Sequence, residues 1–350
     1  MITAIRLRPY VLPLVRPWVA ASATLLTRRG MLLRVEAEDG ESGWGDCAPL
    51  PSSGTDAHQR AFAALNAVAH TLPGRTVAAV LGDLSGLEPP EARWAVETAL
   101  LDLTARRRGV PLAHLLENRP ATEVAINAAL GPLDDGCAGR ALAALDRGFT
   151  LGKIKVGLAP VERELRALRE LNELLGGAMR LRLDANRSWD ETDARRFLAG
   201  LSDLPMDGIE EPLAAPTLGA LGRLQAPVSF ALAIDESLAE LGGGAAVSSG
   251  AVRRLVVKPA RLGGIGRTLG LAAKARDAGM EMVVTSVVES AVGVAAAAHL
   301  AATLPLPAVH GLATSDWLAE DVCPPPVLAQ GRLMLPDGPG LGVSPLDQAP

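Results

Sequence analysis

The chain has 350 residues, of which 49% are hydrophobic and 21% are charged, and its formal net charge is −5. This length and composition indicate a globular protein with a large core and more than one domain, and exclude an intrinsically disordered chain. Only 3% of the residues are aromatic. A nucleic-acid surface needs basic patches and stacking rings, so no nucleic-acid partner is expected.

The location expected from the sequence is the cytoplasm. Cys47, Cys137 and Cys323 lie far apart without metal-ligand spacing, which is typical of cytosolic thiols. The first 18 residues are interrupted by three arginines and lack the apolar core of a signal peptide. Residues 290–313 are apolar but contain two prolines, so they are interpreted as a buried helix followed by a strand, not as a membrane span.

The first part of the chain predicts a small α+β domain over residues 1–117. Within residues 1–52, two strand-like runs flank a hairpin turn at Asp39 and Gly40. The link at about 16–30 is predicted to be a flexible loop. Residues 55–117 change to helical periodicity, with a proline at the start of the second helix and an Arg-Arg-Arg-Gly end.

From about residue 123, short apolar runs alternate with amphipathic helical segments. The eight runs are at 124–130, 151–157, 179–186, 207–212, 229–237, 253–260, 280–290 and 308–314. Strict βα alternation indicates a parallel sheet, and eight strands favour a closed barrel over residues 118–315. The Pro/Gly-rich tail, 316–350, is too short for a domain and is expected to pack back on the first one.

Five of these runs end on a charged residue, in the order Lys155, Asp184, Glu210, Asp235 and Lys258. A charge at the end of an apolar run is costly unless it is paired, metal-bound or used. Each acid alone could be a turn residue or a helix cap. Three acids at successive strand ends favour a shared metal site. A site with only oxygen ligands selects Mg²⁺, with Mn²⁺ as the alternative.

Lys153 and Lys155 form a K-x-K on one strand, so both side chains point to the same side. The alternative interpretation is that Lys153 and Lys155 are simply exposed lysines on an edge strand. Close ammonium groups would lower a lysine pKa toward the range of a general base. Lys258 could instead form a Schiff base, as in barrel aldolases, but then the three acids would have no purpose. Glu211 and Glu236 each follow an assigned ligand and are given a supporting or structural role.

Polar residues near the strand ends are candidates for substrate binding. Thr285 and Ser286 end the seventh strand, where their hydroxyls could bind a carboxylate, and Asn186 follows Asp184 in LDAN. Serine-rich strand ends can also be turns. His299 and His310 lie in apolar surroundings and are interpreted as packed residues.

The motifs together resemble the enolase superfamily, and within it the muconate-lactonising subgroup. They are the K-x-K, LDAN (183–186), IEEP (209–212), DES (235–237), VVKP (256–259) and GWGDCAPLP (43–51). The resemblance covers nearly the whole chain. It implies a modified TIM (β/α)7β barrel with an α+β capping domain, completed by the tail, and a loop at 16–30 that closes over the substrate.

The resemblance also implies a reaction. Members of this superfamily use a lysine or histidine base, with magnesium stabilising an ene-diolate. The implied catalytic residues are Lys155, Lys258 and Lys153. The implied Mg²⁺ ligands are Asp184, Glu210 and Asp235. The expected partner is a small anionic carboxylate substrate, and a homo-oligomer is compatible with the cap and barrel faces.

Within the subgroup, the chain is most similar to o-succinylbenzoate synthases. Dipeptide epimerases carry an Asp-x-Asp after the eighth strand, whereas here Asp316 is followed by Trp317 and Leu318. Arg182 and HGLATSDWL (310–318) add to the likeness, which implies a hydro-lyase of menaquinone biosynthesis. The alternatives are an N-acylamino-acid racemase, a muconate cycloisomerase, or a metal-binding barrel without catalysis.

Overall fold

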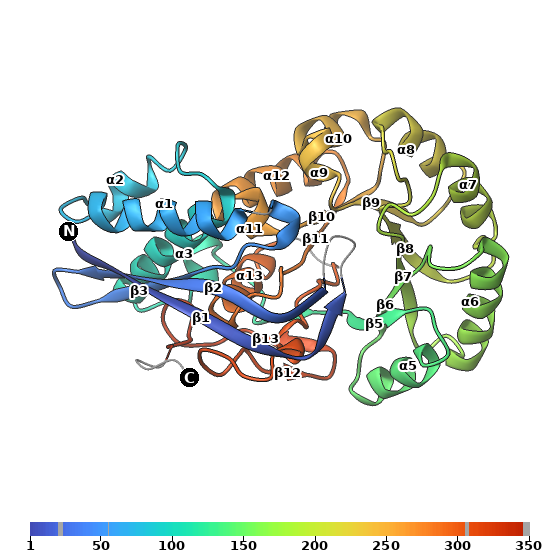
Figure 1. The fold of residues 1–350 in the computed structure, drawn as a ribbon, viewed down its shortest axis with the longest axis horizontal. Helices are drawn as coiled ribbons and strands as arrows, with labels where there is room; N and C mark the ends of the chain where they lie inside the picture. The colour runs from blue at the N-terminus through green and yellow to red at the C-terminus, as the bar shows by residue number, and fades with distance from the viewer. Residues whose placement is uncertain (20–23, 55, 305–307, 346–350) are drawn as a thin grey trace.

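The structure is a computed structural model that describes residues 1–19, 24–54, 56–304 and 308–345. Figure 1 shows a curled sheet flanked by helices, with a cap of strands and helices beside it. The predicted fold class, a modified TIM barrel with an α+β capping domain, is confirmed. No helix among the described residues is both long enough and apolar enough to cross a membrane.

The cap combines an antiparallel sheet with helices packed against it. Its sheet has the order β1 (Ile2–Val19), β2 (Thr24–Ala37), β3 (Ser42–Cys47). Its helices are α1 (Ala57–Thr71), α2 (Val77–Leu81), α3 (Pro90–Arg107) and α4 (Leu112–Leu116). The predicted hairpin turn is confirmed, because Glu36 pairs with Ser42 and Gly40 has a φ of +83°, which favours glycine.

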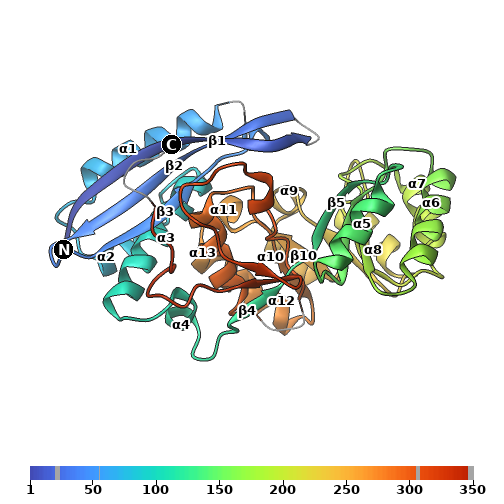
Figure 2. The ribbon, with the colours of Figure 1, turned by 90° about the horizontal axis from the view of Figure 1, so that it is seen from below.

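The prediction of a flexible loop at 16–30 is wrong for the residues of this range that the structure describes. Strand β1 continues to Val19, β2 begins at Thr24, and the two pair as far as Val19 and Thr24 (Figure 2). Residues 20–23 of the predicted loop lie outside the described residues. Prolines and arginines interrupt the strand pattern here, and the register shifts between Pro13 and Trp18. Trp18 and Val19 pair again with β2, a partner that the pattern does not reveal.

The barrel is built around a seven-stranded parallel sheet. In sequence order its strands are β5 (Ala128–Pro132), β6 (Leu151–Lys155), β7 (Arg180–Asp184), β8 (Met206–Glu210), β9 (Ala231–Ile234), β10 (Arg254–Val257) and β11 (Glu281–Val284). Its helices are α5 (Cys137–Asp146), α6 (Val161–Leu175), α7 (Glu191–Ala199), α8 (Leu218–Gln225), α9 (Leu238–Leu241), α10 (Gly243–Ser249), α11 (Pro259–Leu262), α12 (Ile265–Asp277) and α13 (Ala291–Ala301).

The eighth predicted strand, 308–314, is reduced to two residues that bridge the sheet edges. His310 forms a parallel bridge with Ile126, and Gly311 forms one with Thr285. The His310 amide donates to Ala125 O and the Gly311 amide to Val284 O. Only this short stretch bonds to both neighbours, so the segment joins β11 to the start of the barrel without forming a longer strand.

Helix ends and burial follow the local sequence. Helix α6 carries Glu162 and Glu164 in its first turn and ends at Gly176, which is left-handed. All residues of α13 are buried, which confirms the helix predicted in the apolar segment after residue 290.

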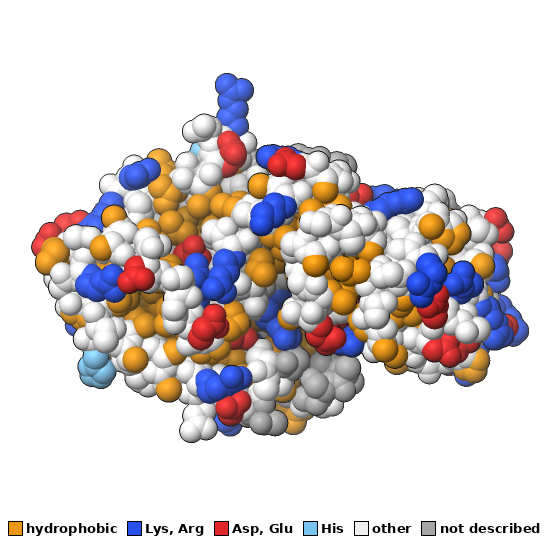
Figure 3. Space-filling view, turned by 90° about the horizontal axis from the view of Figure 1, so that it is seen from above, with side chains coloured by type: hydrophobic (Ala, Val, Ile, Leu, Met, Phe, Trp, Pro, Cys, Tyr) orange, Lys and Arg blue, Asp and Glu red, His pale blue; other side chains and the backbone are white. Residues whose placement is uncertain are grey.

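Figure 3 shows a face on which acidic and basic side chains are interspersed with apolar ones, without a broad basic region.

The tail contacts both the barrel and the cap. Strand β13 (Arg332–Met334) pairs with β12 (Leu328–Ala329) and with β4 (Glu123–Ala125), at the entry to the barrel. Further on, Gly340 O accepts from the amide of Leu112 at 2.7 Å, and the Leu341 amide donates to Asp102 Oδ1 at 2.7 Å. The division at residues 117 and 315 stays a prediction, and residues 346–350 of the tail lie outside the described part.

Candidate active site

The five charged residues predicted at strand ends lie at the carboxyl ends of five neighbouring strands. Lys155, Asp184 and Glu210 are the last residues of β6, β7 and β8, and the register pairs Lys155 with Asp184 and Asp184 with Glu210. Asp235 and Lys258 directly follow β9 and β10. The parallel register therefore brings all five charges to one edge of the sheet.

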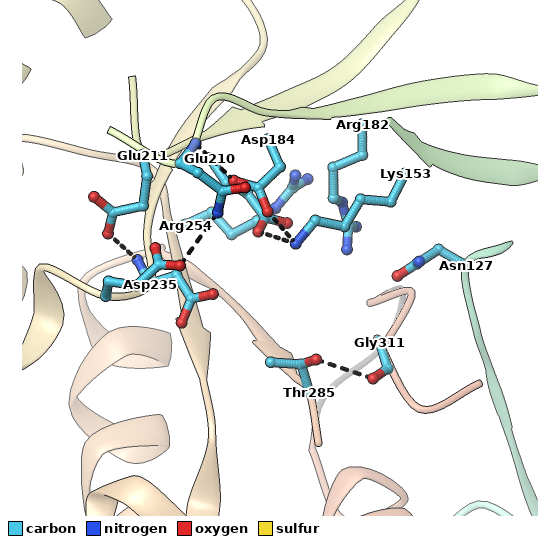
Figure 4. Close-up of polar contacts among 12 residues, drawn as sticks. Asn127, Lys153, Arg182, Asp184, Glu210, Glu211, Asp235, Arg254, Thr285 and Gly311 are labelled. Carbon is cyan, nitrogen blue, oxygen red and sulfur yellow. Dashed lines mark hydrogen bonds and ion pairs between the residues drawn. The ribbon is translucent and has the colours of Figure 1, made fainter. Parts of the chain in front are cut away.

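Lysine ammonium groups contact the three acids. Lys153 Nζ is 2.8 Å from Asp184 Oδ2 and 2.6 Å from Glu210 Oε2 (Figure 4), and Lys258 Nζ contacts both carboxylate oxygens of Asp235. The three acidic side chains are 6%, 1% and 7% exposed. Each buried carboxylate therefore has a cation within hydrogen-bond distance, as a buried charge requires.

The two lysines of the K-x-K have pKa values shifted in opposite directions. Burial opposes the charge of Lys153, but the three acids outweigh burial and raise its pKa. Burial is also the largest influence on Lys155, and there it lowers the pKa, helped by the charges of the neighbouring lysines. The direction predicted for Lys155 agrees with this, but burial rather than repulsion is the larger cause. A lowered lysine pKa is what a general base near neutral pH requires.

The donor set at this edge fits a hard divalent cation. Asp184, Glu210 and Asp235 offer only carboxylate oxygens, are buried, and come from adjacent strand ends; Mg²⁺ takes such ligands. Within the described residues, no three acidic, histidine or cysteine side chains are grouped so as to hold a metal ion, and lysines contact the acids instead. The assignment of these acids as Mg²⁺ ligands stays a prediction, supported by the donor set.

Glu211 and Glu236, which each follow a predicted metal ligand in the sequence, have different surroundings. Glu211 Oε1 accepts hydrogen bonds from the amides of Asp235 (2.5 Å) and Ser237 (2.9 Å) and from the Ser237 hydroxyl (2.7 Å), so it fixes the turn that carries Asp235. Glu236 Oε1 accepts from Asn186 Nδ2 at 3.2 Å. Glu236 Oε2 has no hydrogen-bond partner in the described part of the chain. Burial is the largest influence that raises the pKa of Glu236 to about 7.

Backbone strain gathers at the ends of β7 and β8. Asn186, Arg187 and Glu211 have φ values of 43°, 65° and 48°, in the left-handed region that side chains other than glycine rarely adopt. The Arg187 amide donates to Glu211 O at 2.7 Å, which ties the two turns together. Such strain persists where the surrounding structure fixes it, and it is typical of functional sites.

The residues predicted to bind substrate lie beside this edge and are partly engaged by its loops. Thr285 Oγ1 donates to Gly311 O at 3.0 Å. Ser286 Oγ lies 2.5 Å from Thr314 Oγ1 and is buried. Asn186 donates its amide to Glu236, as described above. Substrate binding by Asn186, Thr285 and Ser286 stays a prediction.

Two arginines lie inside the barrel: Arg182, which the sequence analysis named only as part of a resemblance, and Arg254, which it missed. Arg182 Nε and Arg254 Nη1 donate to the same oxygen, Asp207 Oδ2, at 2.8 and 2.7 Å, and their side chains are 2% and 4% exposed. Gly208 leaves room for them, since a Cβ there would lie 2.6 Å from Arg254 Nη1. We call Arg182 and Arg254 the buried arginine pair. The sequence signal for these buried charges was an arginine inside each of the apolar runs RLRLD and RRLVV.

Asn127 is a further residue that the sequence reasoning missed. It lies between β4 and β5 and is 4% exposed, and its backbone amide donates to His310 O at 2.9 Å. Its Nδ2 donates to Ala128 O at 3.3 Å, whereas its Oδ1 has no partner among the described residues. Figure 4 shows the side chain directed toward the space between Lys153 and Thr285. A polar residue within the apolar run VAINAAL was the available signal.

A cavity of about 750 Å³ adjoins the site between the barrel and the cap. Asp235, Glu236 and Lys258 line it on the barrel side, and residues of α1 and of the start of α3 line it on the cap side. Ligand sites in proteins are commonly concave and lie between domains. The cavity therefore gives a small molecule room next to the charged strand ends.

Comparison with known proteins matches both parts of the chain to described families. Residues 1–117 match the N-terminal domain of the mandelate racemase / muconate lactonizing enzyme family, and residues 137–349 match the enolase C-terminal domain-like family. L-Ala-D/L-Glu epimerase of Bacillus subtilis is 28% identical over 95% of this chain and 93% of its own length. Chloromuconate cycloisomerase of Pseudomonas putida is 30% identical over 72% and 70%.

Solved structures agree with these matches over almost the whole chain. Muconate lactonizing enzyme from Pseudomonas fluorescens, complexed with muconolactone, is 28% identical with a TM-score of 0.89, covering 99% of this chain and 97% of its own. The L-Ala-D/L-Glu epimerase from Bacillus subtilis is 25% identical with a TM-score of 0.88, covering 98% of each chain. The chain belongs to the enolase superfamily, in its muconate cycloisomerase subgroup.

Proposed function

We propose that the protein is a Mg²⁺-dependent enzyme that removes the proton next to a substrate carboxylate. The reaction proposed is the syn dehydration of 2-succinyl-6-hydroxy-2,4-cyclohexadiene-1-carboxylate to 2-succinylbenzoate, a step of menaquinone biosynthesis in the cytoplasm. One observation carries the proposal: a single edge of the sheet holds three buried carboxylates and three lysines, of which Lys155 has a lowered pKa.

The charges at this edge suit an anionic substrate. Asp184, Glu210 and Asp235 would hold Mg²⁺, which when bound supplies positive charge to the substrate carboxylate. Three carboxylates contribute −3, the metal ion +2, and Lys153 and Lys258 in their charged forms +2, which sums to +1. A preorganised positive site stabilises the additional negative charge that forms when the α-proton leaves.

Lys155 acts first as base and then as acid. Its neutral amine takes the α-proton, and the electrons of the broken C–H bond move into the carboxylate to give an ene-diolate. The ene-diolate electrons then return as the bond to the neighbouring hydroxyl breaks, and protonated Lys155 delivers its proton to that oxygen so that water leaves. Lys258 stabilises the anion electrostatically, and Lys153 keeps the charge of the acids compensated.

A contact of Asp316 supports dehydration over dipeptide epimerisation. Asp316, the remaining half of the Asp-x-Asp position, is exposed and pairs with Arg147 at 2.7 Å. Its carboxylate is therefore engaged outside the strand-end cluster. Racemisation or epimerisation is the second candidate, because a curated relative is named as an epimerase and Lys155 and Lys258 could act as bases on opposite faces of one carbon.

The test is a Mg²⁺-dependent assay with the succinyl-cyclohexadiene substrate beside a panel in D₂O. The panel contains N-succinyl-L-phenylglycine, L-Ala-L-Glu and cis,cis-muconate. We expect turnover of the first substrate by the wild type and none by Lys155→Ala. Deuterium incorporation into the amino-acid derivatives without dehydration would assign racemisation, and lactone formation alone would assign cycloisomerisation.

A further inference from the structure

We propose that Glu97 of the cap is a positioning residue for Lys258: its carboxylate holds the glycine turn between α11 and α12, and this turn fixes the backbone that carries Lys258. The inference rests on the proposed function, in which Lys258 stabilises the anion electrostatically. It goes beyond that function because it makes the position of Lys258 depend on the cap, whereas the turn after Lys155 is held from within the barrel.

The carboxylate of Glu97 reaches from the cap to the first turn of a barrel helix. Glu97 lies on α3 and is 8% exposed. Its Oε1 accepts a hydrogen bond from the amide of Gly266, in the first turn of α12, at 3.1 Å. In the described part of the chain, α12 has no side-chain cap from its own N-cap residue, Gly264, and no acidic residue in its first turn. Amides at a helix start need acceptors and favour a negative charge, so the cap supplies what the barrel helix lacks.

Two glycines before α12 make room for this carboxylate. A Cβ built on Gly264 would overlap Glu97 Oε2, and one on Gly263 would lie 3.1 Å from Pro90 Cβ at the start of α3. The φ values of Gly263 and Gly264 are +87° and +133°, which residues other than glycine rarely adopt. The turn is therefore shaped to receive the cap at close range.

Backbone hydrogen bonds connect the glycine turn to Lys258. Helix α11 begins directly after Lys258, which is its N-cap, and packs against α3 (Figure 1). The amides of residues 261–264 donate to the carbonyl oxygens of Lys258 and Pro259 at 2.9 to 3.0 Å. A helix of one turn is not stable by itself, so α11 depends on what holds its end. A shift of the glycine turn would therefore move Lys258, whose Nζ contacts both carboxylate oxygens of Asp235.

The turn after Lys155 is held in a similar way, but by the barrel itself. Glu164 of α6 is 2% exposed, and its carboxylate accepts hydrogen bonds from the amides of residues 157–159 at 2.9, 2.9 and 3.2 Å. Each of the two lysines is thus followed by a turn that a buried glutamate holds. The glutamate behind Lys155 belongs to the barrel, and the one behind Lys258 belongs to the cap.

The first test is amide hydrogen exchange, followed by mass spectrometry, on the full-length protein without ligand. We expect Glu97→Ala to raise the exchange rates of amides 261–264 roughly 10- to 100-fold, the range for losing a hydrogen bond to a charged group, and to leave amides 157–159 unchanged. Glu164→Ala is the matched variant and should give the reverse pattern. No increase at 261–264, or equal increases in both segments, would overturn the inference. Glu97→Gln, which keeps one acceptor oxygen, serves if Glu97→Ala does not fold.

A double-mutant cycle separates positioning of Lys258 from a general structural effect. Binding of 2-succinylbenzoate with Mg²⁺ is measured by isothermal titration calorimetry for wild type, Glu97→Ala, Lys258→Ala and the double variant. Glu97→Ala should weaken binding roughly 3- to 30-fold when Lys258 is present, as expected for coupled residues, and less than about twofold in the Lys258→Ala background. The same change in both backgrounds would overturn the inference. If wild type does not bind the compound, the proposed reaction is overturned, and the exchange pattern decides the role of Glu97.

Discussion

Replacing Lys153 by methionine is expected to destabilise the protein strongly when divalent cations are absent. The Lys153 ammonium lies 2.8 Å from Asp184 and 2.6 Å from Glu210, whose side chains are 6% and 1% exposed. Methionine is also long and unbranched, so the main change is the loss of the charge. Removing one partner of a buried ion pair costs about 3–5 kcal/mol because the remaining charge is uncompensated, and here two carboxylates lose the same cation.

A divalent cation is expected to restore much of this loss. A ligand that binds only the folded state stabilises it by RT ln(1 + [L]/Kd), which is about 2.7 kcal/mol at 100 times Kd. In the wild type, Lys153 already compensates two of the acids. Mg²⁺ should therefore stabilise Lys153→Met more than it stabilises the wild type, because in the variant it supplies charge that no side chain provides.

The assay is urea unfolding followed by far-UV circular dichroism, in EDTA and in Mg²⁺. Lys274→Met is the matched control, since Lys274 is exposed on α12 and its replacement should change the free energy of unfolding by less than about 0.5 kcal/mol. Equal losses for the two variants in EDTA would refute the idea that Lys153 compensates the acids. If Mg²⁺ stabilises neither the wild type nor Lys153→Met, the three acids are not its ligands.

Three more predictions concern the chemistry, the pH dependence and the barrel interior. Lys155→Ala and Lys258→Ala should each abolish turnover with an unchanged circular dichroism spectrum; near-normal activity in either would contradict its assigned role. Burial is the largest influence that raises the pKa of Glu289 to about 7, from an ordinary value of 4.5, so the stability it contributes is complete below about pH 4.5 and is lost as the pH rises through 7. Glu289→Gln should therefore match the wild type in urea unfolding near pH 5 and exceed it by roughly 2–3 kcal/mol near pH 8, whereas stability curves that stay parallel would argue against this. Asp207→Asn keeps an acceptor oxygen but leaves the buried arginine pair without its shared negative charge, and it should cost about 3–5 kcal/mol in the same assay. Glu281→Gln removes the charge of a partner of Arg254 whose side chain is 60% exposed, so it should lower the free energy of unfolding by less than about 1 kcal/mol. If Glu281→Gln and Asp207→Asn lower it equally, burial does not determine the cost of losing a partner of these arginines.

The strand-end charges could be predicted from the sequence because their signals are local. Each follows a short apolar run, and parallel topology sends all such ends to one edge. The sequence also indicated different roles for neighbouring acids. Glu211 holds the turn at Asp235 through three hydrogen bonds, in agreement with the structural role given to it.

Features that depend on distant pairing could not be predicted in the same way. Asn127 faces the site because its neighbour Ile126 bridges His310, and nothing near Asn127 in the chain specifies that partner. Similarly, residues 16–19 resemble a loop because Arg16 and Pro17 interrupt the pattern, but β1 continues through them and pairs again with β2 at Trp18 and Val19. The contact between Lys153 and two acids depends on side-chain positions that strand periodicity does not determine.

The bonds between the tail and the cap have a consequence for synthesis on the ribosome. The cap sequence leaves the exit tunnel before the barrel, but the bonds that Leu112 and Asp102 make with the tail form only when residues 340 and 341 have been translated. Until then the barrel, which lies between them in the chain, can fold beside an unfinished cap. We expect nascent chains stalled before residue 340 to show a cap that proteases cleave more readily than the barrel.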